Sequence, residues 1–273
     1  MNSTSLSSAS ALFGVAAPGL AAAQIASIAL LSLRIAATFA MTPVLYATPL
    51  PASVRMLLVL SFSLAMATGL AVPAGPWTGW SAFLSAALHE LALGATMGLG
   101  VLLAFGAFSV AGQLLDVQLG FGMAQLIDPV TRRPVPILTS AFEYFAVLMF
   151  FLVNGHHALL RGIAYSLERF PPGAPWSLVQ SAAPLFKQVT GLFSLGFALA
   201  APVIFCIVLV EFVLGVVGRN LPQMNMFTMG IPVKLLVGLA ALSLWFAGIG
   251  GVMTRVYASI AGTWDAIFAG AVR

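Results

Sequence analysis

Apolar residues dominate this sequence in six long stretches, each able to cross a bilayer as a helix. Such a crossing takes about 20 consecutive apolar residues. Prolines, glycines and polar residues gather between the stretches, and Trp77 and Trp80 flank one of these breaks, where interfacial aromatics are common. The pattern predicts helices over residues 20–46, 54–72, 80–115, 137–153, 189–217 and 231–260. It predicts a loop with short helices at most over residues 154–188.

The composition indicates that these stretches belong to a membrane protein and are not the buried helices of a soluble domain. Of the 273 residues, 61% are hydrophobic and 7% are charged, whereas a soluble domain has roughly 45–50% apolar and about 25% charged residues. We therefore expect an all-α polytopic membrane protein with one helical domain over residues 20–273. A Ser- and Ala-rich segment over residues 1–19 is expected to be poorly ordered. It has no Lys or Arg, so it lacks the basic region of a secretory signal, and we expect the first apolar stretch to be retained.

The sequence offers little for enzymatic chemistry. His89-Glu90 begins like a zinc-protease motif, but the second His required four residues after the first is replaced by Leu93. His156 and His157 are adjacent, so they point to different faces of a helix. The sequence contains neither a Gly-x-Ser-x-Gly elbow nor a Gly-Lys-Ser/Thr phosphate loop. We expect no catalysis, metal or cofactor, and the scattered net charge of +4 predicts no nucleic-acid partner.

Four charged residues lie within or beside the apolar stretches: Arg34, Glu90, Glu143 and Glu211. A charge at the bilayer centre costs about 2.5–3.5 kcal/mol on insertion scales, so such groups face protein or water rather than lipid. One interpretation is an ion or proton path, as in a small-molecule transporter coupled through Glu143 or Glu211. The other is pairing with a second helix or subunit, which we favour because the acids form no dense series.

Two glycines four residues apart, Gly94 and Gly98, create a narrow face on the third stretch. Small residues at this spacing let helix backbones approach closely. The face packs either within the chain or against another subunit.

The segment Gly112–Pro136 is too polar for lipid and too apolar for an ordinary solvated loop. Irregular backbone at membrane depth occurs only where it is buried in protein or lines a cavity. The segment is therefore predicted to be a pore loop or plug, with an amphipathic connector as the alternative. The candidate plug residues are Gln118, Leu119, Gly120, Phe121, Gly122, Met123, Gln125 and Asp128.

Several motifs occur in the order found in one known family. They are Arg-Ile-Ala-Ala-Thr-Phe-Ala-Met-Thr-Pro at 34–43, Glu-Leu-Ala-Leu-Gly at 90–94, Gly-x-x-x-Asp-x-Gln-x-Gly at 112–120, Asp-Pro at 128–129 and Asn-Gly-His at 154–156. The most specific is Arg-Asn-Leu-Pro-Gln-Met-Asn-Met-Phe-Thr-Met-Gly-Ile-Pro-Val-Lys at 219–234. The sequence resembles the FliR/SctT family of type III export-gate proteins over essentially its whole length.

The resemblance implies a non-enzymatic gate subunit that joins FliP- and FliQ-like subunits and an FlhB-like switch protein. Such a gate passes unfolded flagellar proteins across the bacterial inner membrane at the flagellar basal body. The segment Gly112–Arg132 would help to plug the closed channel. The helices would be bent hairpins raised out of the bilayer plane, packed partly on lipid and partly on other subunits. The expected subunit contacts are Gly94, Gly98, Glu90, Glu211 and Arg219.

The motif at 219–234 looks more like the flagellar branch than the injectisome branch of the family. An injectisome gate subunit of the SctT type is the alternative, and a small-molecule transporter is the more distant one.

Overall fold

Eight α-helices and one short β-ribbon make up the part of the chain that the structure describes. The structure is a computed structural model that describes residues 18–43, 51–70, 79–121, 125–127, 134–176, 178–220 and 226–270. The helices are α2 (Pro18–Ala40), α3 (Ala52–Gly69), α4 (Trp80–Leu119), α5 (Ile137–Leu152), α6 (Gly155–Arg169), α7 (Leu178–Asn220), α8 (Met226–Gly248) and α9 (Gly250–Gly270). The strands are β1 (Gln125–Ile127) and β2 (Pro134–Pro136).

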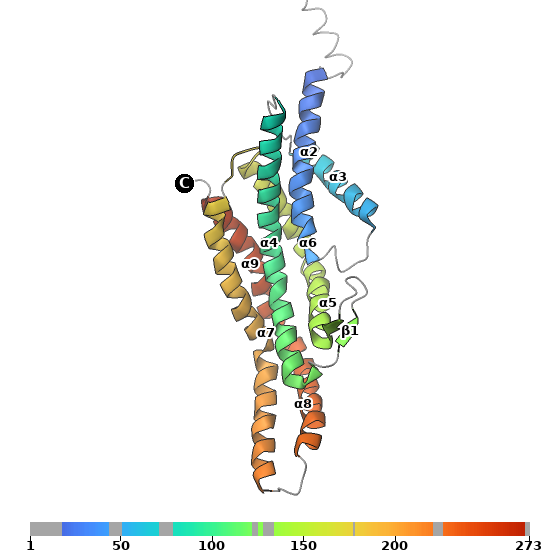
Figure 1. Cartoon of the computed structure of the whole chain (residues 1–273), viewed down its shortest axis with the longest axis vertical. Helices are drawn as coiled ribbons and strands as arrows, with labels where there is room; N and C mark the ends of the chain where they lie inside the picture. Colours follow the sequence, from blue (N-terminus) through green and yellow to red (C-terminus); the bar gives the residue numbers. More distant parts are fainter. Residues whose placement is uncertain are drawn as a thin grey trace, which may run out of the picture.

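Helix α4 is the central element of the fold. It runs along the long axis of the molecule, with α2 beside its N-terminal half (Figure 1). It packs most extensively on α7, α2 and α5, and also contacts α9. Its buried side chains, including Met97, Phe108 and Leu115, face the surrounding helices of the same chain. Leu102 and Val117 are exposed on its other side.

Five of the described helices are long and apolar enough to cross a membrane, or six spans if the bent pair α5–α6 counts as one. This confirms the predicted all-α polytopic class. Helix α5 buries one side, with Leu138, Phe142, Ala146 and Phe150 spaced four residues apart. Asn154 then adopts a left-handed conformation (φ 57°), and α6 leaves at 71° to α5.

Several predicted boundaries were wrong. Helix α2 ends at Ala40 rather than at residue 46, and α9 continues to Gly270 rather than ending at residue 260. The single stretch 231–260 is two helices, α8 and α9, which meet at Ile249 between Gly248 and Gly250. The predicted loop 154–188 contains α6 and the first turns of α7, because its Pro-rich part is confined to residues 171–175. Helix α4 continues to Leu119, beyond the predicted end at 115. Of the N-terminal segment predicted at 1–19, only residues 18 and 19 are described, and they begin α2.

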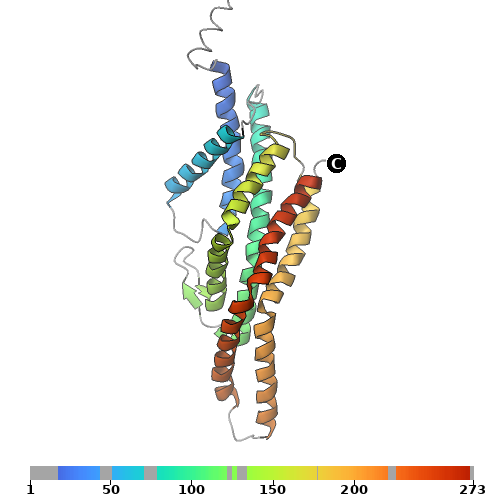
Figure 2. The same ribbon diagram turned by 180° about the vertical axis from the view of Figure 1, so that it is seen from behind.

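The ends of α7 and α8 nearest each other extend past the C-terminal end of α4 (Figures 1 and 2). Over this extension few side chains of the same chain cover the two helices. In the apolar windows of α7 and α8, only 22% and 17% of the residues are buried, whereas the figure for α4 is 61%. The fold therefore has a packed body around α4 and an uncovered helical hairpin beyond it.

Candidate functional site

The connection between α4 and α5 contains the predicted plug segment. Helix α4 ends at Leu119 and is capped by Gly120, which adopts a left-handed conformation (φ 85°) that glycine reaches without steric cost. Strands β1 and β2 then form an antiparallel ribbon in which Gln125 pairs with Pro136 and Ile127 with Pro134. The ribbon lies beside the start of α5, at the edge of the body (Figure 1).

Asp116 fixes where α5 begins. Its carboxylate accepts hydrogen bonds from the backbone N–H groups of Leu138 (3.0 Å) and Thr139 (2.8 Å) and from the Thr139 hydroxyl (2.8 Å). The first N–H groups of a helix have no partner within the helix, and a negative charge there interacts favourably with the helix dipole. Asp116 is only 1% exposed. Asp116, which made this segment look polar in the sequence, is therefore a residue of α4 that caps the start of α5.

The backbones of α4 and α5 also approach each other closely at this point. A Cβ added to Gly112 would lie 2.5 Å from the Thr139 Cα, so only glycine allows this contact between α4 and the first turn of α5. The end of α4 and the start of α5 are therefore joined by a buried carboxylate and by direct backbone contact.

The plug candidates divide between the body and the ribbon. Leu119 is 2% exposed and belongs to the main core, where it packs on Gly238 of α8. It is part of a helix rather than of a loop, which corrects the prediction for this residue. Gln118 and Phe121 are half-buried and Gly120 is exposed, while Gln125 lies in β1. Gly122, Met123 and Asp128 lie outside the described residues.

A second polar cluster is buried between α2, α4 and α6. Arg34 donates from Nε to Glu90 Oε2 (2.6 Å) and from Nη2 to Glu90 Oε1 (2.9 Å). It also donates to the Ser166 hydroxyl (3.1 Å) and to the Phe170 carbonyl (2.8 Å). Both members of the ion pair are 1% exposed. Two parallel bonds between a guanidinium and a carboxylate form the strongest common side-chain pair.

The loop after α6 is attached to the same cluster. Glu90 Oε1 accepts a hydrogen bond from the backbone N–H of Gly173 (2.8 Å), a residue with a φ of 77°. The prediction that Arg34 and Glu90 pair with other helices identified the right kind of contact. The roles of Ser166, Phe170 and Gly173 were missed, because a backbone carbonyl or N–H leaves no signal in residue type.

The Gly94–Gly98 face packs on α2 of the same chain. A Cβ on Gly94 would collide with the Arg34 carbonyl, and one on Gly98 would lie 2.8 Å from the Thr38 carbonyl. The Thr38 hydroxyl crosses the contact to the Gly94 carbonyl (3.1 Å). The structure supports the intrachain alternative and corrects the expected subunit contact at Gly94, Gly98 and Glu90. These residues fill the contact between α2 and α4 and leave no surface there for another subunit.

The remaining charged candidates lie nearer the surface. Glu211 of α7 forms an ion pair with Lys234 of α8, and Arg219 is in the last turn of α7, on the hairpin that extends beyond the body. Glu143 accepts a hydrogen bond from Ser109 (2.6 Å). The expectation that Glu211 and Arg219 contact other subunits stays a prediction.

The structure brings the rings of His156 and His157 together, which corrects the expectation that they point to different faces of a helix. The rings of His156 and His157 lie 4.2 Å apart at the start of α6, and His89 is half-buried on α4. Across the described ranges, no three His, Cys, Asp or Glu side chains are close enough to share a metal ion.

Large apolar side chains line the outside of the α7–α8 hairpin. They include Phe205 and Phe212 of α7 and Leu236 and Leu244 of α8, which are between 63% and 78% exposed. Exposed apolar surface on this scale marks contact with lipid or with other proteins. The α7–α8 hairpin is thus one of the described surfaces that lipid or another protein must cover, together with α3, whose apolar window is only 6% buried.

The chain matches the family described as bacterial export proteins, family 1, over residues 25–260. It is 31% identical to the flagellar biosynthetic protein FliR of Bacillus subtilis (strain 168) over 185 residues, 64% of this chain and 69% of that protein. It is 28% identical to FliR of Escherichia coli (strain K12) over 212 residues, 77% of this chain and 80% of that protein. It is also 26% identical to the secretion system apparatus protein SsaT of Salmonella typhimurium over 158 residues, 58% of this chain and 61% of that protein. With 236 consecutive residues matched, from 25 to 260, the chain belongs to family 1 of the bacterial export proteins.

Proposed function

We propose that this chain is a non-enzymatic subunit of a flagellar type III export gate. With FliP- and FliQ-like subunits it would form the channel that passes unfolded flagellar proteins across the inner membrane, next to an FlhB-like switch protein at the basal body. The family match over residues 25–260 carries this proposal. The relatives named FliR support the flagellar branch, and SsaT keeps an injectisome gate as the second candidate.

The lengths of the two longest helices support a position partly outside the bilayer. Helix α4 has 40 residues and α7 has 43. At about 1.5 Å per residue each is about 60 Å long, twice the roughly 30 Å of bilayer hydrocarbon. Two packed helices of this length do not fit within the hydrocarbon at ordinary tilts. Part of each must be covered by protein or by water, as in a gate raised out of the membrane plane.

The uncovered apolar faces support an assembly of several subunits. Once α7 and α8 leave the bilayer, residues such as Phe212 and Leu236 face water unless another helix covers them. Burying apolar surface of this kind gains roughly 25 cal/mol per Å². The hairpin would therefore bind the partner subunits, with Glu211 and Arg219 among the polar contacts at that surface.

The ribbon between α4 and α5 is our candidate for the closed gate. Its two described strands are short, Gly120 precedes them, and Asp116 of α4 holds the start of α5 that follows them. Gln118, Gly120, Phe121, Gly122, Met123, Gln125 and Asp128 remain the proposed plug residues, whereas Leu119 stays with the core.

The export function is tested by deletion and complementation. A strain lacking this gene should neither swim nor secrete flagellin, and a plasmid copy should restore both. A tagged copy should co-purify with the FliP- and FliQ-like chains of the same bacterium. Normal motility in the deletion strain, with loss of secretion through an injectisome, would assign the chain to the second candidate. Normal secretion through both systems would overturn the proposal.

The gate is tested by replacing residues 122–133 with a short Gly-Ser linker, which keeps Asp116 and Leu119. We expect the variant to assemble and to make cells permeable to small ions, because Gly122, Met123, Gln125 and Asp128 of the plug are removed and the body is not. The matched control is the same variant in cells that lack the FliP-like subunit, where no channel forms. Tight membranes in an assembled variant would refute the plug assignment.

A further inference from the structure

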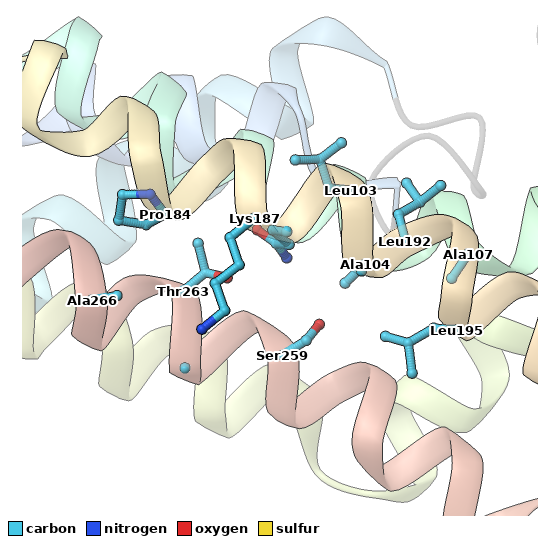
Figure 3. A pocket seen from close by; sticks show the side chains of 13 residues that line it. Leu103, Ala104, Ala107, Pro184, Lys187, Leu192, Leu195, Ser259, Thr263 and Ala266 are labelled. Atoms are coloured by element: carbon cyan, nitrogen blue, oxygen red, sulfur yellow. The ribbon is translucent and has the colours of Figure 1, made fainter.

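A cavity of about 310 Å³ lies between α4, α7 and α9 (Figure 3), and its lining residues belong to neither polar cluster described above. Ligand cavities of proteins start at about 300 Å³. The inner wall is apolar and formed by residues such as Leu103, Leu192 and Leu195. The polar lining is confined to Lys187 and Gln188 of α7 and to Ser259 and Thr263 of α9. The cavity therefore combines an apolar wall with one positively charged side.

Lys187 is the one charged residue among the described residues of the lining. Its side chain extends from α7 toward α9, between Thr263 and Ser259 (Figure 3). The ion pairs found within the described ranges are Arg34–Glu90 and Lys234–Glu211, so the Lys187 ammonium has no carboxylate partner there. Lys187 also lies within the apolar window of α7 that begins at Ser181. An unpaired cation near the end of an apolar helix favours an anion from outside the chain.

Gln188 adds an unsatisfied acceptor beside this cation. Its Nε2 donates to the Gly100 carbonyl (2.7 Å), which holds the carboxamide in place. Its Oε1 is buried and accepts no hydrogen bond. Buried polar atoms are rarely left without a partner. A hydroxyl group of a bound molecule, or a water bound with it, would donate the missing hydrogen bond to Gln188 Oε1.

Two glycines keep the cavity open. Gly191 of α7 and Gly262 of α9 both line it, and a Cβ added to either would meet no atom within 4 Å. These glycines differ from Gly94 and Gly98, where a neighbouring backbone forbids a side chain. The space can therefore be filled by substitution without displacing a neighbour.

The surroundings of the cavity favour lipid as the occupant. Phe186, Val189 and Phe193 of α7 are exposed on either side of Lys187 in the sequence, so the cation projects from a helix that carries large uncovered apolar side chains. Lysine side chains near the ends of membrane helices reach the level of the lipid headgroups, and basic pockets between membrane helices bind anionic headgroups.

We propose that this cavity binds one anionic phospholipid, with the phosphate at Lys187 and an acyl chain along Leu103, Leu192 and Leu195. The site is separate from the ribbon and from the α7–α8 hairpin. The proposal needs only that the chain lies in a membrane and does not rest on the export function.

The test is native mass spectrometry of the full chain, titrated with phosphatidylglycerol or with phosphatidylcholine of the same acyl chains. The wild type should retain one phosphatidylglycerol in preference to phosphatidylcholine. Lys187→Met should weaken phosphatidylglycerol binding about five- to ten-fold, the usual effect of one basic residue at an anionic membrane surface, and Lys187→Arg should keep it. Gly191→Leu should abolish retention of both lipids by filling the cavity.

The matched control for Gly191→Leu is Gly215→Leu. Gly215 also lies on α7 with no atom within 4 Å of an added Cβ, but it does not line the cavity. Equal binding of the two lipids, or full retention by Lys187→Met, overturns the proposal. A carbodiimide cross-link between Lys187 and a partner subunit also overturns it, since an acidic side chain would then occupy the site. If Gly191→Leu fails to fold, the comparison of Lys187→Met with Lys187→Arg decides.

Discussion

Removing one member of the buried Arg34–Glu90 pair should destabilise the chain more than removing both. Arg34 makes four hydrogen bonds, two of them to Glu90. In Glu90→Leu the guanidinium keeps only the Ser166 hydroxyl and the Phe170 carbonyl as acceptors, and it stays buried with its full charge. In Arg34→Met, Glu90 keeps only the N–H of Gly173. Both single variants therefore leave an uncompensated buried charge.

The size of the effect follows from the burial. With both side chains 1% exposed, water does not screen the charge that remains, and breaking such a pair from one side costs about 3–5 kcal/mol. For a chain of this size, that corresponds to a fall in apparent Tm on the order of 10 °C. Replacing both partners by apolar residues of similar volume is often close to neutral, so Arg34→Met/Glu90→Leu should recover most of the loss.

The assay is the thermal stability of the detergent-solubilised chain, followed by fluorescence-detected size exclusion after heating. Glu211→Leu is the control, because Glu211 is also ion-paired but its side chain is 40% exposed. Ion pairs as exposed as this contribute about 0–1 kcal/mol of stability, so the Tm of Glu211→Leu should stay close to that of the wild type. A double variant as unstable as the singles, or a Glu211→Leu loss equal to that of Glu90→Leu, would refute the reasoning.

Two further substitutions test the contacts of α4. Asp116→Ala should lower the free energy of unfolding by about 1–3 kcal/mol, because the Leu138 and Thr139 N–H groups lose their buried acceptor. Limited proteolysis should then cut the α4–α5 connection faster than in the wild type. An unchanged rate of cleavage would contradict the role of Asp116 as a cap. Gly98→Val should lower the free energy of unfolding by about 1–3 kcal/mol through overpacking against the Thr38 carbonyl. Gly215→Val is the control, because the added side chain has open space, and its Tm should stay near that of the wild type. Equal losses of stability at the two glycines would contradict the α2–α4 contact.

The sequence predicted the helical class and most helix positions because apolar stretches of this length have few other uses. It failed where polar residues continue a helix. Asp116 and Gln118 suggested a loop after residue 115, but the carboxylate of Asp116 is satisfied by the next helix, so α4 continues to Leu119. The break at Ile249 was missed although Gly248 and Gly250 flank it, because the apolar stretch continues beyond these glycines and periodicity alone does not reveal a change of direction.

The contacts of the candidate residues were harder to predict than their identity. Arg34, Glu90, Gly94 and Gly98 stood out from their surroundings in the sequence, since charges and small residues are conspicuous within apolar helices. Whether they meet each other or another subunit depends on how α2 and α4 pack, which is a tertiary property. The hydrogen bond from the Thr38 hydroxyl to the Gly94 carbonyl shows the two helices in direct contact, and neither residue type alone reveals it.

The bonds of Asp116 also determine which part of the α4–α5 connection can change in length. The start of α5 is fixed by a side chain of α4, and the ribbon closes immediately before it. Residues inserted between Ile127 and Pro134 leave the pairing of the strands and the packing of α5 unchanged, and each doubling of a loop costs only about 0.6 kcal/mol. An insertion between Asp116 and Gly120 would instead displace Leu119 from the core. An epitope or a spectroscopic label can therefore be inserted between Ile127 and Pro134 without rebuilding the packed part of the subunit.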